Sequence, residues 1–324
     1  MRKSTAFIAT IGLSVFSLPS QSQTLEDWQL SLGGFVTASD VRPHNGLPQD
    51  RADILNALSG KNPDWARALE IYTWGANFPW RGMTHSLGRF ADDYNGAMPS
   101  VLPRSVAFWD DASFAVAPVY SALAGTGRFY QIAPEARISF VEGATLATIL
   151  NWTRLELLMA ERKALATEPN WALTNGSPKN WNKIFAFHWG PDGQHSVHEA
   201  LEQVPEGPRV NTALYAALAE GQPHLLNQRW AEDEAAHVAG ILHEAALRLF
   251  HAALVKAKES GDKDSRNRAA MRARGLWLAA AEAILTLVPG EADGIDAALA
   301  GKGDPDLLPF AREAVEEALV KLSG

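Results

Sequence analysis

Apolar residues recur every three or four positions along most of the chain, which is the spacing of amphipathic helices. Between residues 135 and 166, Ile138, Val141 and Ile149 follow this period. The same spacing predicts helices over residues 64–74, 135–166, 180–189, 210–220, 228–259, 265–287 and 307–322. The sequence therefore predicts an all-α helical bundle.

The segment from residue 75 to 134 breaks this pattern, because it is rich in Gly, Pro, Trp and Asp. Strand signals are confined to short apolar pieces near Phe35 and Val106. A loop of this length inside a compact domain usually has a function. We therefore expect a long irregular insertion in the bundle.

Two predicted helix ends resemble each other and suggest an internal duplication. The segment 65–75 ends in Tyr-Thr-Trp-Gly and the segment 181–190 ends in Phe-His-Trp-Gly, and a long helix follows each. This favours one domain, 23–324, with pseudo-symmetric halves over about 60–170 and 175–324. Chance similarity in a chain rich in alanine and tryptophan is the alternative.

The first residues have the pattern of a signal peptide. Arg2 and Lys3 precede an apolar run over 6–18, and a small-polar stretch follows up to about Ser22. We expect cleavage near Ser22 and a periplasmic or secreted protein. The apolar run is too short to span a bilayer comfortably, and no later stretch reaches about 18 uninterrupted apolar residues, so we expect no integral membrane segment.

Composition and charge narrow the function. The 324 residues carry a formal net charge of -8, are 47% hydrophobic and include no cysteine. The hydrophobic fraction argues against a disordered chain, and the absence of cysteine excludes disulfides, thiolate metal sites and cysteine nucleophiles. Because phosphate neutralisation needs a basic surface, we expect no nucleic-acid partner.

Familiar catalytic motifs are absent. The sequence contains no phosphate-binding glycine loop, dinucleotide fingerprint or serine-nucleophile elbow. His243 and Glu244 begin a zinc-protease motif, but Leu247 stands where its second histidine belongs. The candidate chemistry therefore depends on scattered residues.

The two similar helix ends supply the first candidates. His188 lies in the last turn of an apolar helix, and Glu70 and Tyr72 lie in the corresponding part of the first copy. If the copies face each other, these three side chains converge into a ligand set suited to ferric iron, and less so to copper or zinc. Hydrogen-bonded core residues are the alternative for Tyr72 and His188.

Other polar residues allow two interpretations each. Glu142 is either solvated or turned inward as a ligand, and His195, His198 and Glu199 form either a weak metal site or part of a helix cap. The irregular stretch adds His85, and its aspartates could act as acid and base or cap turns. These aspartates are Asp92, Asp93, Asp110 and Asp111.

At several of these residues the chain resembles the Fea1 family, the low-iron-inducible periplasmic proteins of algae and bacteria that are related to the phytotransferrins. The matching pieces are short and spread over residues 65–289. They are Ile71 to Asn77, Trp181 to Gly190, Val210-Asn211 with Glu220 to Gln222, and Gly275 to Trp277 with the stretch up to Val288-Pro289. Two features depart from the family: the chain lacks the cysteines of the algal members, and His188 stands where a tyrosine is expected.

The resemblance implies a non-enzymatic periplasmic protein that captures iron for an inner-membrane transporter. The form of iron that it favours is ferric iron with a bound carbonate. Zinc and copper remain open. A trivalent cation needs anionic oxygen donors, so we expect ligands from among Glu70, Tyr72, His85, Glu142 and His188. Arg137, at the start of a long predicted helix, is the expected carbonate anchor.

Two other function classes remain open. Eleven tryptophans and the aspartate-rich stretch fit a carbohydrate-active enzyme of the helical-toroid type, in which an Asp/Glu pair divides the acid and base roles. A non-enzymatic interaction module is the third class. Metal analysis separates the first class from the others.

Overall fold

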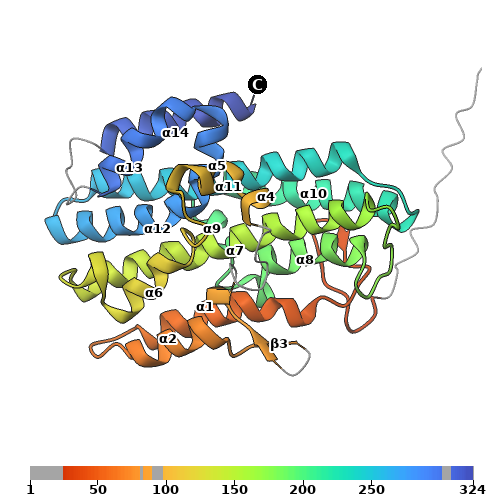
Figure 1. Ribbon diagram of the computed structural model, residues 1–324, viewed down its shortest axis with the longest axis horizontal. Coiled ribbons are helices and arrows are strands. Elements are labelled where there is room, and N and C mark those ends of the chain that lie inside the picture. The colour runs from red at the N-terminus through yellow and green to blue at the C-terminus, as the bar shows by residue number, and fades with distance from the viewer. Residues whose placement is uncertain (1–24, 81–82, 90–97, 301–307, 324) are drawn as a thin grey trace, which may run out of the picture.

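The chain folds as an all-α helical bundle, as the hydrophobic spacing predicts (Figure 1). The computed structural model describes residues 25–80, 83–89, 98–300 and 308–323. The predicted signal segment, residues 1–22, lies outside the described residues.

The helices that the sequence predicts are all present, with shifts of a few residues at their ends. They are α2 (Trp65–Trp74), α7 (Pro134–Ala164), α8 (Ser177–Trp189), α10 (Gly207–Leu226), α11 (Glu232–Glu259), α12 (Lys263–Leu287) and α14 (Leu308–Ser323). The helices absent from the prediction are α1 (Gly46–Ala57), α4 (Met98–Val101), α5 (Pro103–Trp109), α6 (Ala117–Ala124) and α13 (Ala292–Ala300). The start of α9 (Val197–Glu202) agrees with the helix-cap alternative at Glu199.

The stretch 75–134 is more regular than predicted, since it includes α4, α5 and α6. The strand expected near Val106 is wrong, because Val106 lies within α5, whose first turn begins at Pro103. The strand signal at Phe35 is confirmed: β1 (Ser31–Leu32) pairs antiparallel with β2 (Phe35–Val36). A second hairpin joins β3 (Phe78–Trp80) and β4 (Met83–His85).

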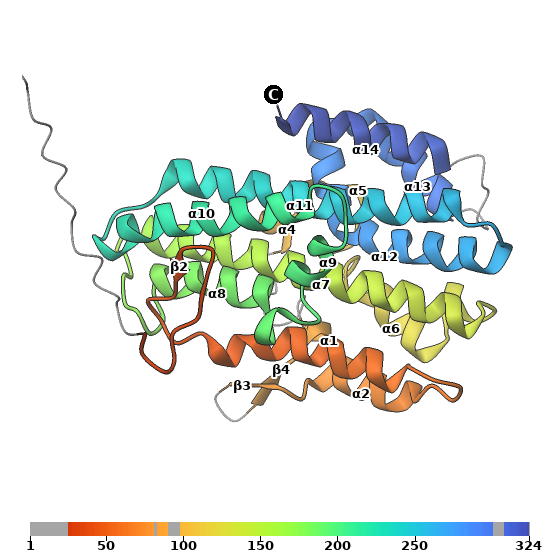
Figure 2. The ribbon, with the colours of Figure 1, turned by 180° about the vertical axis from the view of Figure 1, so that it is seen from behind.

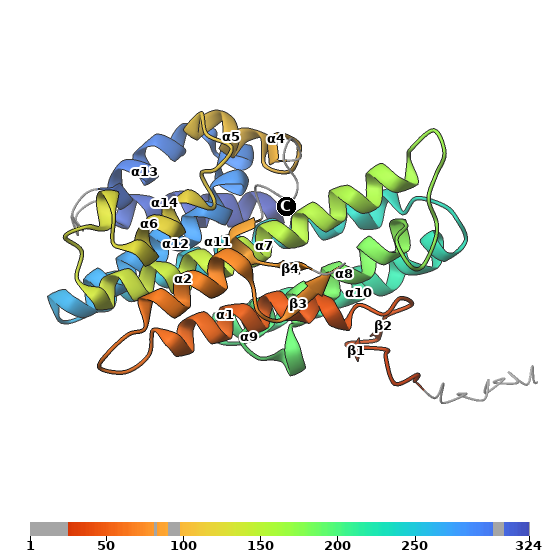
Figure 3. The same ribbon diagram turned by 60° about the horizontal axis from the view of Figure 1, so that its bottom comes forward.

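Helix α7 lies at the centre of the bundle and packs against α12 on one side and α8 on the other. Helices α1 and α2 with the β3–β4 hairpin lie along one side of the long helices, and α13 and α14 lie on the opposite side (Figures 1 and 2). Figure 3 shows the hairpin beside α1 and α8. Through its middle, α7 is buried almost without interruption from Phe140 to Glu156.

Two glycines allow α7 and α12 to pack closely. A β-carbon on Gly143 would come 2.3 Å from the carbonyl oxygen of Arg272, and one on Gly275 would come 2.4 Å from that of Phe140. Neither backbone position can move without separating the helices, so a larger residue does not fit there.

Helices α2 and α8 end in the same way. Gly75 has φ 70° and ψ 167°, and Gly190 has φ 68° and ψ -167°, a conformation that favours glycine. The helices have different neighbours, since α2 packs on α1 and α6 whereas α8 packs on α7 and α10. The duplication stays a prediction.

Within the described ranges, one helix is long and apolar enough to cross a membrane by length and composition. This helix is α11, whose most apolar window has a mean hydropathy of 1.4 and is 56% buried inside the protein. Helix α11 packs on α12, α10 and α14, which accounts for its apolar residues.

Candidate functional site

A cavity of about 540 Å³ lies between α7 and α8 and is closed at one end by the 3-10 turn η1 (Arg42–Asn45) and the β3–β4 hairpin. Small-molecule sites have volumes in this range. We call it the α7–α8 cavity. Its lining residues are Pro43, His44, Phe78, His85, Trp152, Glu156, Met159, Lys163, Asn170, Thr174, Asn175, Lys179, Asn180 and Lys183.

Helix α7 supplies one wall from residues spaced along a single face. Trp152, Glu156, Met159 and Lys163 are four, three and four positions apart, so their side chains project in the same direction. From Trp152 to Lys163 the helix rises about 16 Å. This wall therefore changes from aromatic to cationic along its length.

Helix α8 supplies cationic and polar residues to the facing wall. A loop folds the chain back, so that Lys179, Asn180 and Lys183 near the start of α8 lie opposite the later part of α7. Further along, the Phe187 ring lies 5.9 Å from the Trp152 ring, centroid to centroid. The α7 wall is thus cationic at the loop end and aromatic at the deep end, while Phe187 packs behind Trp152 and does not line the cavity.

Glu156 organises the cationic end. Its side chain is 1% exposed, and its Oε1 lies 3.2 Å from Nζ of Lys183. Asn180 donates from Nδ2 to Oε2 of the same carboxylate. Lys163 donates to the carbonyl oxygen of Asn175 and to Oδ1 of Asn180, both at 2.6 Å.

The lysines outnumber the acids around the cavity. Lys163, Lys179 and Lys183 line it, and among the described lining residues Glu156 is the one carboxylate. Burial lowers the pKa of Lys163, and the nearby charge of Lys183 lowers it further. Lys179 is affected in the same two ways. The cavity thus holds an excess of positive charge.

Aromatic rings enclose the deep end. The His44 and Phe78 centroids are 4.8 Å apart, those of Phe78 and His85 are 4.9 Å apart, and those of His85 and Trp152 are 6.3 Å apart. Burial, followed by the charges of Lys183 and Lys179, lowers the pKa of His44 well below its ordinary value. His44 is therefore neutral near pH 7.

The other residues predicted as metal ligands lie in separate environments. Glu70 is exposed and pairs with Arg67 at 2.7 Å. Tyr72 is buried, and its hydroxyl donates to the carbonyl oxygen of Val116 at 3.4 Å. Burial raises the pKa of Tyr72, so the neutral phenol is favoured over the tyrosinate.

Glu142 and Arg137 also have partners of their own. The half-exposed carboxylate of Glu142 lies 3.2 Å from a guanidinium nitrogen of Arg272. Arg137 lies 3.9 Å above the Trp65 ring and donates to the carbonyl oxygens of Ala122 and Leu123. In this arrangement Arg137 caps the end of α6.

His188 belongs to a buried polar network on the far side of α8. One ring nitrogen, Nε2, is 2.8 Å from Oδ1 of Asn211, which in turn donates to Glu202. The other ring nitrogen is buried and has no hydrogen-bond partner. Burial lowers the pKa of His188 to about 4.

The cluster after Gly193, formed by His195, His198 and Glu199, takes part in a helix cap and in a hydrogen bond to Tyr215. The Ser196 hydroxyl accepts a hydrogen bond from the backbone of Glu199, so Ser196 caps α9. The hydroxyl of Tyr215 lies 2.8 Å from Nδ1 of His198. Glu199 accepts from the backbone N–H of His195 at 2.6 Å.

The described part of the chain brings no three His, Asp or Glu side chains together in a group that could hold a metal ion. Of the predicted ligands, His85 lines the α7–α8 cavity and the others do not. Asp92 and Asp93 lie outside the described residues. Asp110 ends α5, and Asp111 accepts a hydrogen bond from the backbone of Ser113. The metal site stays a prediction.

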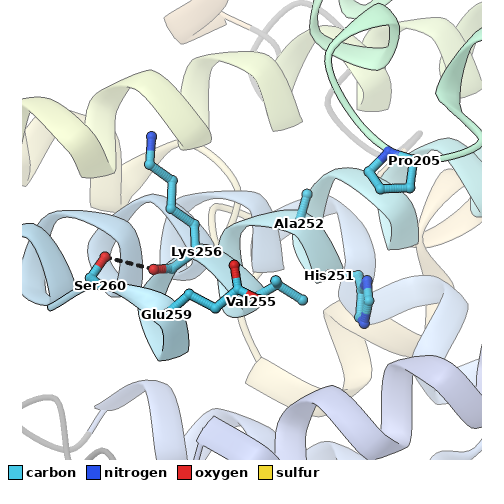
Figure 4. A pocket seen from close by; sticks show the side chains of 7 residues that line it. All are labelled: Pro205, His251, Ala252, Val255, Lys256, Glu259 and Ser260. Carbon is cyan, nitrogen blue, oxygen red and sulfur yellow. Dashed lines mark hydrogen bonds between the residues drawn. The ribbon is translucent and has the colours of Figure 1, made fainter.

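A second cavity, of about 480 Å³, is less suited to a ligand. It follows the outer surface of α11, and all but one of its lining residues come from this helix or its C-terminal end (Figure 4). Its polar groups are Lys256 and Glu259, which are exposed, together with His251 and Ser260, which are partly exposed. No buried charged residue lines this groove within the described residues.

Comparison with protein-family models, curated proteins and solved structures found no match. The resemblance to the low-iron-inducible proteins therefore stays a prediction. The three lysines and Glu156 are not among the residues that the sequence predicts for a site. One signal points to them: Lys179 and Lys183 are four positions apart and share a face of α8, and Glu156 is a carboxylate at the end of the buried stretch of α7.

Proposed function

We propose that this protein binds a small organic anion in the α7–α8 cavity. The observation that carries this proposal is the set of three lysine ammonium groups around the single buried carboxylate of Glu156. Half-buried positive charges are costly without compensation, and an anion in the cavity would supply it. The predicted signal segment supports export, so the proposed site of action is the periplasm or the cell exterior.

The lysines have hydrogen-bonding capacity left for a ligand. Each ammonium has three N–H donors. Lys163 uses two of them, Lys179 donates to the backbone of Asp40, and Lys183 pairs with Glu156. Five donors of the three lysines therefore remain for water or an anion, and charge-assisted hydrogen bonds to a carboxylate are among the stronger ones.

The predicted role in iron capture is compatible with this cavity in one form. Three ammonium groups repel a bare ferric ion, whereas an iron complex with a net negative charge would be attracted. An anionic chelate such as ferric citrate is therefore the form of iron that we propose for this cavity. The iron-free anion serves as its control.

The test is isothermal titration calorimetry of the mature protein with succinate, citrate, benzoate and ferric citrate. We expect at least one to bind, and we expect Lys163→Met to weaken that binding by about tenfold, as loss of one charge-assisted hydrogen bond implies. Lys258→Met, which removes an exposed lysine on α11, is the matched control and should bind like the natural protein. No binding by any of these anions, or equal loss in both variants, would contradict the proposal.

A further inference from the structure

The deep end of the α7–α8 cavity is lined by aromatic side chains, which a small aliphatic anion bound at the lysines would not contact. Beyond the lysines the lining changes to His44, Phe78, His85 and Trp152. Neighbouring centroids lie between 4.8 and 6.3 Å apart, and the rings are tilted or perpendicular to one another. Such a group presents both ring faces and ring edges to whatever occupies the space between them.

We infer that the ligand is an aromatic carboxylate, with its ring at the His44–Trp152 end and its carboxylate at the lysine end. This inference rests on the proposed function, because it specifies the anion that the same cavity takes. The order of residues along α7 carries it. The lining residues of α7 run from Trp152 to Lys163, and the α8 lysines, Lys179 and Lys183, lie opposite the later part of α7.

His44 adds a polar contact at the aromatic end. Its Nδ1 lies 3.3 Å from the carbonyl oxygen of Val41, so the neutral ring donates from Nδ1. In that tautomer Nε2 is an acceptor. A ring hydroxyl on the ligand can donate to it, and the favoured ligands are therefore hydroxylated aromatic acids.

Three probes of nearly equal size separate the ring from the charge. They are 4-hydroxybenzoate, trans-4-hydroxycyclohexanecarboxylate, which has no flat ring, and 4-hydroxybenzamide, which has no charge. We expect 4-hydroxybenzoate to bind the mature protein at least tenfold more tightly than either of the others in calorimetry. The saturated acid tests the ring, and the amide tests the lysines.

The outcomes distinguish this inference from the proposed function. If the two acids bind equally and the amide binds more weakly, the ligand need not be aromatic. That result would overturn this inference but still support an anion-binding cavity. No binding of either acid, together with no binding of succinate or citrate, would overturn both.

Substitution at the aromatic end gives a second readout. Phe78→Leu keeps an apolar side chain while removing one ring. We expect this variant to reduce the difference in affinity between 4-hydroxybenzoate and the saturated acid. His85→Leu tests the same point if Phe78→Leu fails to fold, since His85 is partly exposed. An undiminished difference in a folded variant of either kind would contradict the placement of the ring.

Discussion

The ammonium of Lys183 lies 3.2 Å from the carboxylate of Glu156, and the Glu156 side chain is 1% exposed while that of Lys183 is 16% exposed. This pair joins α7 to α8 at the cationic end of the cavity. It also sets the charge balance there, because Glu156 offsets one of three lysines.

Glu156→Gln should therefore separate stability from binding. Glutamine keeps an acceptor for Asn180 but leaves Lys183 without its ion-pair partner, so we expect a loss of about 2–3 kcal/mol in the free energy of unfolding. Affinity for anions should rise, because the cavity gains positive charge. Urea unfolding and calorimetry measure the two effects. Unchanged or weaker anion binding in the folded variant would count against the charge argument.

The glycine contacts between α7 and α12 predict opposite effects for similar substitutions. Gly143→Ala and Gly275→Ala each force a methyl group against backbone, and each should lower the free energy of unfolding by about 2–3 kcal/mol. Gly240→Ala on α11 meets nothing within 4 Å and should raise it by about 0.5–1 kcal/mol. Denaturant unfolding of the three variants checks this, and a stabilised Gly143→Ala would show that the helices are not in close contact.

The burial of His188 predicts that the free energy of unfolding decreases in acid. Burial lowers its folded pKa to about 4 from an ordinary 6.5, so the unfolded chain takes up a proton between these values and the native protein does not. Above pH 6.5 the His188 ring is neutral in both states and does not lower the free energy of unfolding. As the pH drops to 4, protonation of the unfolded chain lowers the free energy of unfolding by about 3 kcal/mol. His188→Gln should reduce this acid dependence in urea unfolding measured from pH 7.5 to 4.5. An identical pH profile in both proteins would contradict the burial of His188.

Asp50 changes the free energy of unfolding in the opposite direction to His188 over nearly the same range of pH. Burial raises its pKa to about 6, even though its Oδ1 accepts from the backbones of Ala76 and Asn77 and from the Asn77 amide. The native state therefore holds a proton that the unfolded state releases from pH 3.8 upward, and stability falls by about 3 kcal/mol as the pH rises to 6. In Asp50→Asn this fall should vanish, leaving a steeper rise in stability from pH 4 to 6.5 than in the natural protein.

The helices were predictable because each depends on local spacing. The run through Val141 and Ile149 already indicates α7, and Gly190 indicates where α8 ends. Helix α5 was missed because it is short and its residues, Pro103 to Trp109, include a proline that is usually a sign of a turn.

The site was less predictable because it depends on which helices become neighbours. Placing Tyr72 beside His188 assumed that α2 and α8 face each other, whereas α2 packs on α1 and α6. Lys163 and Lys179 lie on different helices, and the fold of the loop between them brings them to one cavity. His85 was identified from the irregular stretch, and it does line this cavity.

A crystal structure of the mature protein grown with saturating 4-hydroxybenzoate would show whether the α7–α8 cavity holds an aromatic carboxylate. We expect ligand density in the α7–α8 cavity, with a carboxylate oxygen about 3 Å from Nζ of Lys163, Lys179 or Lys183. An empty cavity at saturating ligand, or the ligand bound at another surface, would contradict this expectation.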